Sequence, residues 1–217
     1  FITNNKDRLN DYFFQYIVNV IIPMIILFLS SLVASYFLLM FLRNRKEQFN
    51  LYICIALFLI SIYSTGLFIE GVPFGYLIAT KIWYTALFLA QMFLVFYFQE
   101  FYKIHSHWII KAVLGFITSV CCLILIFTKT VDFAYFLINK IFYLALVSPI
   151  NLYFLFLSIY AIKKGNPYAI VLLVGISMMV IGATYDIIFV SLANEPPMWL
   201  TNSGIVLYIL SMYLTSP

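Results

Sequence analysis

Four ionisable side chains interrupt the long apolar blocks of this sequence: Glu70, Lys81, Lys140 and Asp186. A charged side chain inside a membrane is costly, so such residues usually mark a ligand site, a proton path or an ion pair. Two of the four are acidic and two are basic, so their charges can cancel in pairs. Two interpretations follow. The residues line a polar pocket that opens outward and binds a ligand, or they form an ion-pair network that locks the helices together.

Helical spacing orients part of this cluster. Gly175, Gly182 and Asp186 recur at i, i+7 and i+11, which places them on one stripe of a helix. Small residues let membrane helices approach closely, so this stripe should face protein and carry Asp186 inward. Lys140 and Asn151 repeat the same spacing of eleven residues. The lysine side chains can instead extend along the apolar surface and place their ammonium groups at the outer headgroups.

A second stripe joins Tyr63, Gly66 and Glu70 on one helix face. The sequence therefore predicts one polar cluster, as ligand pocket or structural network, and one set of packing glycines. The predicted cluster is Glu70, Lys81, Lys140, Asp186, Tyr63 and Asn151, and the predicted packing residues are Gly66, Gly175, Gly182 and Gly204.

Other chemistry is poorly supported by the residues. A retinal protein needs a Schiff-base lysine, normally in its last helix, and the block from Trp199 to Pro217 has no Lys or Arg. An intramembrane protease needs a second aspartate or a Ser/His pair, but Asp186 is the one Asp within a block and both histidines lie in a loop. We predict no enzymatic activity for this segment, no cofactor and no metal site. The cysteines are Cys54, Cys121 and Cys122, all within apolar blocks, and they show no metal-ligand spacing.

The elements that carry these residues are apolar blocks long enough to cross a bilayer. Of the 217 residues, 65% are hydrophobic and 9% are charged, whereas soluble domains carry about 25% charged residues. We predict an all-α membrane protein, a seven-transmembrane-helix bundle over residues 13–217, with residues 1–12 as a juxtamembrane lead-in. The predicted helices are 13–42, 50–70, 77–99, 108–128, 134–161, 167–191 and 199–216.

Lysine and arginine gather in alternate loops, which predicts the orientation. Positive residues in short loops stay on the cytoplasmic side of a membrane. One set of loops clearly holds Lys129 alone, whereas the other set holds Arg43, Arg45, Lys46, Lys103, Lys111, Lys163 and Lys164. The amino end is therefore predicted outside and the carboxyl end in the cytoplasm. The net charge of +4 sits at the ends of the blocks and predicts no nucleic-acid partner.

Prolines and tryptophans add two smaller predictions. Pro23 and Pro149 each remove one helical hydrogen bond, so both mark candidate kinks. Tryptophans favour the membrane–water interface, so all three are predicted to be interfacial anchors. They are Trp83, Trp108 and Trp199.

Several local segments resemble a known family. A basic turn runs into an aromatic helix at residues 43–52 (RNRKEQFNLY), and residues 161–169 (AIKKGNPYA) join two later helices. Further segments belong to the same arrangement: SIYSTG at 61–66, Gly175, GATYD at 182–186 and NSG at 202–204. This arrangement resembles the bacterial seven-transmembrane receptors with diverse intracellular signalling modules, over nearly the whole chain.

The resemblance implies a sensor in the bacterial inner membrane. Members of that family commonly carry an extracytoplasmic sensor domain before the first helix and a cytoplasmic kinase, cyclase or phosphatase after the last. It implies a homodimer in the full protein, with the lipid bilayer as the surroundings of this segment. A small-solute or ion transporter or channel is the alternative, which the odd helix count and the absence of ionisable residues in the inner half disfavour.

Overall fold

A computed structural model describes residues 13, 16–66, 76–104, 108–191 and 200–215 of the chain. A few side chains within these ranges, those of Asn139, Lys140 and Asn202 among them, are not described. The described residues are helical apart from short turns, as the sequence predicts. Their helices run η1 Ile17–Ile21, α2 Ile22–Arg43, α3 Gln48–Thr65, α4 Tyr76–Phe101, α5 Trp108–Phe127, α6 Val131–Phe136, η2 Leu137–Val147, α7 Ser148–Lys163, α8 Tyr168–Ser191 and α9 Leu200–Leu214.

Six of these helices are long and apolar enough to cross a membrane. They are α2, α3, α4, α5, α7 and α8, and their most apolar windows have mean hydropathies of 1.5 to 2.5. The helix α9 is shorter: its 15 residues extend about 22 Å, against a hydrocarbon thickness of about 30 Å. The structure therefore supports a multi-pass membrane protein with six clear spans and one shorter apolar helix.

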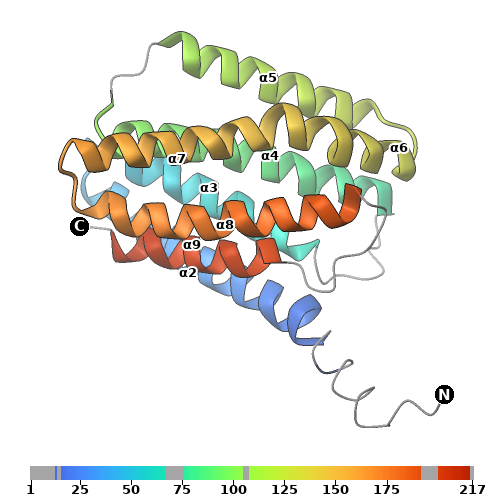
Figure 1. Ribbon diagram of the computed structural model, residues 1–217, viewed down its shortest axis with the longest axis horizontal. Coiled ribbons are helices and arrows are strands. Elements are labelled where there is room, and N and C mark those ends of the chain that lie inside the picture. Colours follow the sequence, from blue (N-terminus) through green and yellow to red (C-terminus); the bar gives the residue numbers. More distant parts are fainter. Residues whose placement is uncertain (1–12, 14–15, 67–75, 105–107, 192–199, 216–217) are drawn as a thin grey trace.

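The long helices lie side by side with their axes roughly parallel or antiparallel (Figure 1). The helix α9 packs along α8 and also contacts α2, while α3 packs between α2 and α4. The helix α5 lies at the edge of the bundle and contacts α4 and η2. The carboxyl end of the described chain lies at the end of the bundle where α7 turns into α8.

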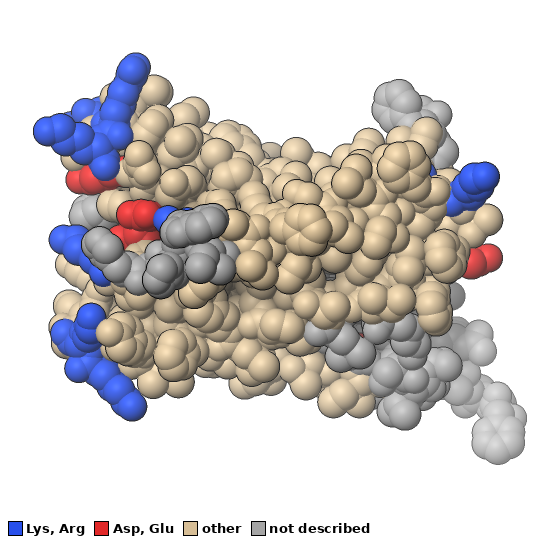
Figure 2. Space-filling view, turned by 90° about the horizontal axis from the view of Figure 1, so that it is seen from above, with Lys and Arg blue, Asp and Glu red and all other residues tan. Residues whose placement is uncertain are grey.

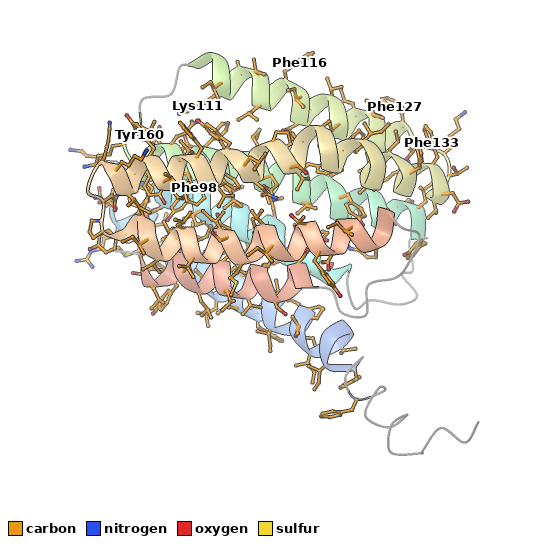
Figure 3. The ribbon with its side chains drawn as sticks, in the orientation of Figure 1. Phe98, Lys111, Phe116, Phe127, Phe133 and Tyr160 are labelled. Atoms are coloured by element: carbon orange, nitrogen blue, oxygen red, sulfur yellow. The ribbon has the colours of Figure 1, made fainter. Side chains whose placement is uncertain are left out.

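Apolar side chains fill the interior, and apolar side chains also cover much of the outside. Phe37, Leu57, Phe88 and Phe154 are fully buried between helices. On the outer surface, Phe116 is 70% exposed and projects away from the bundle (Figure 3). An apolar exterior of this kind is stable in lipid and would be unfavourable in water.

Two π-helical segments precede the two helix prolines. The segment η1 ends shortly before Pro23, and the eleven-residue η2 ends shortly before Pro149. A proline has no N–H, and its ring clashes with the carbonyl four residues earlier. Widening the preceding turns removes that clash, so both predicted kink positions coincide with a change of helix type.

Charged side chains gather at the two ends of the bundle, and the broad middle of the visible face has none (Figure 2). Lysine and arginine dominate one end, which holds the turn after α2, the end of α4 and the α7–α8 turn. The opposite end holds Lys129 and Asp132, at the α5–α6 turn. The separation of charge by alternate turns is therefore also a separation in space.

Candidate functional site

The predicted polar cluster is described only in part. Glu70 lies outside the described residues, and Lys140 lies in η2 with an undescribed side chain. The pairing of these two residues with Asp186 or Lys81 stays a prediction. The four members whose side chains are described lie in separate places and have different surroundings. They are Lys81, Asp186, Tyr63 and Asn151.

Asp186 holds the beginning of α9. Its side chain on α8 is buried, and its Oδ2 accepts a hydrogen bond from the backbone N–H of Thr201 at 2.9 Å. Thr201 is the second residue of α9, where backbone N–H groups have no partner within the helix. The positive end of the helix dipole also favours a carboxylate. Asp186 is thus a capping group supplied by the neighbouring helix.

Lys81 makes the complementary contact at the end of another helix. Its Nζ donates to the carbonyl of Ile126 in the last turn of α5, at 2.7 Å. The carbonyls of a last turn have no helical partner, and a cation there is stabilised by the dipole. Lys81 therefore connects α4 to α5 near the end of the bundle that carries Lys129.

The other two described members lie at helix interfaces. The Tyr63 ring meets Tyr84 of α4 edge to face, with 6.0 Å between ring centroids. Asn151 of α7 is buried, and its Oδ1 has no hydrogen-bond partner among the described residues. Asn151 therefore offers an unused acceptor inside the protein.

Two of the predicted packing glycines, Gly204 and Gly175, lie at close contacts between α8 and α9. A Cβ at Gly204 of α9 would stand 2.6 Å from the Cα of Met179 on α8. A Cβ at Gly175 of α8 would overlap the Ser211 side chain and stand 3.1 Å from the Cα of Tyr208, both on α9. The α8–α9 interface thus brings backbone against backbone. Gly182 is also buried on α8.

Gly66 accommodates an indole ring. A Cβ at Gly66 would overlap the ring of Trp83, which is 8% exposed. The prediction that Trp83 is an interfacial anchor is therefore wrong. Its ring fills the space that a residue without a side chain leaves at the end of α3. Trp108 and Trp199 have no described side chains.

The half of the bundle toward the basic end holds a buried aromatic and hydroxyl cluster that the sequence analysis missed. Tyr97 and Tyr208 are fully buried, and Phe98 lies between α7 and α9 with its ring 6.3 Å from Tyr208 and 5.0 Å from Phe154 (Figure 3). The Tyr97 hydroxyl lies beside Thr215, the residue after α9. The residue that follows α9 therefore lies next to α4.

Tyr102 extends this cluster beyond the end of the α4 span. Its hydroxyl shares a hydrogen bond with that of Ser158 on α7 at 3.1 Å. Burial raises the pKa of Tyr102 to about 12, although the bond to Ser158 lowers it in part. The phenol is therefore neutral at physiological pH and can both donate and accept a hydrogen bond.

Several polar atoms of this half have unused hydrogen-bonding capacity. The Nε2 of Gln99 donates to the Tyr153 hydroxyl at 3.2 Å, but its Oε1 has no partner in the described part of the chain. The buried hydroxyl of Tyr208 is also unpartnered there. Buried polar atoms without partners are uncommon, and they occur where a small polar molecule or a second conformation can satisfy them.

These contacts hold α9 at its beginning, in its middle and at its end. Asp186 caps its beginning, the glycine contacts fix its middle against α8, and Tyr97 meets its end at Thr215. These contacts connect α9 to α8 at its beginning and to α4 at its end. We call Asp186, Gly204, Gly175, Tyr97 and Thr215 the α9 seat.

Comparison with known proteins identifies the family. The sequence model of the family described as "7TM diverse intracellular signalling" matches residues 19–215. The chain belongs to this family. The match includes every described helix from α2 to α9 and all of the α9 seat. No curated protein and no solved structure matches the chain.

Within the 7TM diverse intracellular signalling family, the match ends where α9 ends. The helix α9, Leu200–Leu214, is the last helix of the matched region. Of the α9 seat, Thr215 is the last residue of the matched region.

Proposed function

We propose that this chain is a sensor module of the bacterial inner membrane that passes an extracytoplasmic signal to a cytoplasmic effector. In this proposal α9 completes a seventh span, the amino end is outside and the carboxyl end is inside. The effector, a kinase, cyclase or phosphatase, follows α9 in the full protein, which acts as a homodimer. The segment itself has no enzymatic activity.

The observation that carries the proposal is the α9 seat. The helix α9 is capped by α8 through Asp186 at one end and contacts α4 through Thr215 at the other. A signal that favours one of two arrangements of α8 would move the end of α9 in the same step. The size of that response is limited by the difference in the signal's affinity for the two arrangements.

A spin-label experiment tests the relay. Labels at Leu214→Cys on α9 and Phe156→Cys on α7 occupy exposed positions, in a background whose three cysteines are replaced by alanine. Asp186→Asn should weaken the cap and shift or broaden the label distance by about 1–2 Å, the usual size of helix shifts in switching proteins. An unchanged distance distribution would show that α9 is static and would contradict the relay.

The orientation has its own test. A cysteine at Asn166, in the α7–α8 turn, should resist a membrane-impermeant thiol reagent in intact cells, because seven basic residues lie in loops on its side. A cysteine at Asn194, outside the described residues, should react. The reverse labelling would put the effector on the wrong side of the membrane.

The transporter alternative is tested in sealed liposomes that contain the purified chain. We expect uptake of ions and small solutes no faster than in empty liposomes. Uptake that disappears in Asp186→Asn would instead support a transporter or channel.

A further inference from the structure

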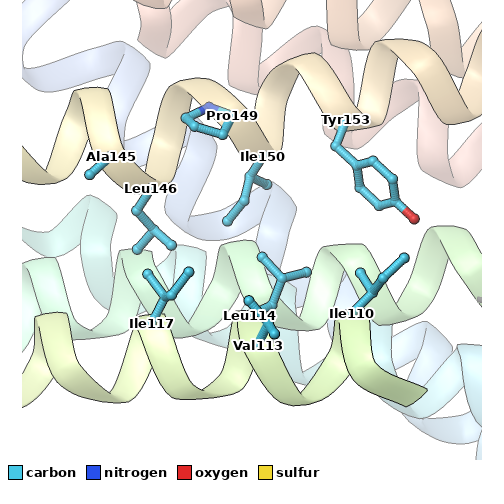
Figure 4. A pocket seen from close by; sticks show the side chains of 9 residues that line it. All are labelled: Ile110, Val113, Leu114, Ile117, Ala145, Leu146, Pro149, Ile150 and Tyr153. Atoms are coloured by element: carbon cyan, nitrogen blue, oxygen red, sulfur yellow. The ribbon is translucent and has the colours of Figure 1, made fainter. Parts of the chain in front are cut away.

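A long apolar groove separates α5 from the η2–α7 helix. Its volume is about 320 Å³, within the size range of small ligand sites. Nine side chains line it, eight of them apolar, and Tyr153 is the exception. Figure 4 shows the α5 side chains facing those of η2 and α7 across this space, with the Tyr153 ring directed toward α5.

The groove is open along its length. Val113 on α5 is 49% exposed, and Ala145 and Pro149 on the other wall are exposed as well. The α5 helix packs mainly on α4 and lies at the edge of the bundle. In a membrane protein such an opening faces the hydrocarbon of the bilayer.

One end of the groove continues toward the basic end of the molecule. Tyr153 lies ten residues before the last residue of α7, whereas Ile110 of the facing wall lies two residues after the first residue of α5. With 1.5 Å per residue, α7 therefore extends roughly 12 Å beyond the start of α5. Figure 1 shows the same offset, with α5 beginning inward of the α7–α8 turn.

The ammonium group of Lys164 lies at the part of α7 that extends beyond the start of α5. Tyr160 follows Tyr153 by seven residues, so both lie on the same face of α7. The Nζ of Lys164 lies 4.7 Å from the Tyr160 ring centroid, and Lys164 has no acidic partner among the described residues. Lys111 on the facing helix is instead paired with Glu100 at 3.1 Å. Lys164 therefore supplies a positive charge at this end of the groove that no described carboxylate neutralises.

We propose that the groove between α5 and α7 binds one anionic phospholipid of the surrounding leaflet. One acyl chain lies between Val113 and Ala145, and the phosphate lies next to the Lys164 ammonium, at the level of Tyr160. The Tyr153 hydroxyl already accepts a hydrogen bond from Gln99, and its own proton can go to an ester carbonyl of the lipid. The bound chain fills space between α5 and α7 that no side chain of the protein occupies.

The shape of the groove and its charge favour a lipid over a second copy of this chain. A helix of a partner is about 10 Å wide and needs a broad face, whereas this groove has a volume of about 320 Å³. A partner's matching surface would also bring a second Lys164 to the contact, if it packed symmetrically, and like charges would repel.

Native mass spectrometry of the purified chain tests the proposal. The chain is incubated with dioleoyl phosphatidylglycerol or with dioleoyl phosphatidylcholine, which share acyl chains and differ in headgroup charge. We expect one retained phosphatidylglycerol and a preference of about fivefold over phosphatidylcholine, the contribution of one lysine near an anionic headgroup. Lys164→Gln should remove the preference, while Lys46→Gln, an exposed lysine in another turn, should keep it.

A groove-filling variant tests the position of the acyl chain. Ala145→Trp should abolish retention of the lipid, whereas Ala112→Trp, an exposed α5 position outside the groove, should not. Far-UV circular dichroism checks that both variants fold, and Val113→Trp fills the groove from the other wall if Ala145→Trp does not fold. Unchanged retention in a folded groove-filling variant, or equal retention of the two lipids by the unmodified chain, would overturn the proposal. A dimer that Ala145→Trp breaks without loss of lipid would also overturn it.

Discussion

The α8 and α9 helices are in close backbone contact, whereas an open groove lies between α5 and α7. Gly204 and Gly175 bring α8 and α9 into backbone contact, and Asp186 adds a charged hydrogen bond across the same interface. Between α5 and α7 there is a groove of about 320 Å³ instead. Gly115 on α5 has open space where its Cβ would be.

The difference indicates which parts of the bundle can change position independently. A close glycine contact has one good arrangement, so α8 and α9 should move together. A helix at the edge of the bundle that faces lipid on its outer side can shift with the membrane. We infer that α9 transmits displacement and that α5 adapts to its lipid surroundings.

Alanine substitutions at Gly204 and Gly115 should give the largest difference in unfolding free energy between the two helix pairs. Gly204→Ala places a methyl group against the α8 backbone, so the free energy of unfolding should fall by about 1–3 kcal/mol. Gly115→Ala meets open space and should raise it by about 0.5–1 kcal/mol, because alanine favours the helix. Unfolding in mixed micelles of dodecyl sulfate and dodecyl maltoside measures both. Equal losses at the two positions would show that α8 and α9 are not more tightly packed than α5.

Removing the cap of α9 should have the next largest effect. Asp186→Ala leaves the Thr201 N–H without its acceptor and should lower the free energy of unfolding by about 1–2 kcal/mol. Asp186→Asn keeps an acceptor oxygen and should cost less than Asp186→Ala. A loss of about 3–5 kcal/mol in Asp186→Asn, partly restored by Lys140→Gln, would indicate instead the buried ion pair that the sequence suggests.

The two fully buried tyrosines of the aromatic and hydroxyl cluster, Tyr97 and Tyr208, should differ in what their hydroxyl groups contribute to stability. Tyr97→Phe removes a hydroxyl that lies beside Thr215 and should cost about 1 kcal/mol of unfolding free energy. Tyr208→Phe removes a hydroxyl with no partner among the described residues, so its cost should be close to zero. The same micelle titration measures both. A large loss in Tyr208→Phe would mean that its hydroxyl is satisfied by a molecule bound inside the bundle.

The contact between α4 and α5 should contribute least. Lys81→Met removes the ammonium from the Ile126 carbonyl and should lower the free energy of unfolding by about 0.3–1 kcal/mol. Lys129→Met, at the exposed turn after α5, should change it less. A loss above that of Asp186→Ala would show that α5 depends on Lys81 and is not a loosely held helix.

Some of these features follow from sequence patterns, because apolar length and polar breaks reflect the demands of the bilayer directly. Each of the seven predicted helices overlaps a helix of the structure, and the Gly175, Gly182 and Asp186 stripe is buried. The contact of Asp186 with Thr201 was not predictable. It depends on which helix begins beside α8, and that is a property of the folded bundle.

The buried aromatic and hydroxyl cluster was missed for a different reason. Its residues are neutral, and with 17 tyrosines and 23 phenylalanines in the chain no single one stands out. Spacing offered one signal: Ser211 and Thr215 are four residues apart and share a face of the last helix. Trp83 shows that residue preference alone can mislead, since the space beside Gly66 lets its ring pack inside the bundle.

The π-helical turns before Pro149 give the chain a place where its length can change. Each i→i+5 turn contains one residue more than an α turn. Deletion of one residue within Leu137–Val147 can therefore be absorbed by restoring an α turn, without rotating Pro149 and Tyr153 away from α5. The same deletion in the middle of α8 would turn half of that helix by about 100° and carry Gly175 or Asp186 off the α9 interface. Insertions and deletions in this family should accordingly be tolerated before the proline and excluded from α8.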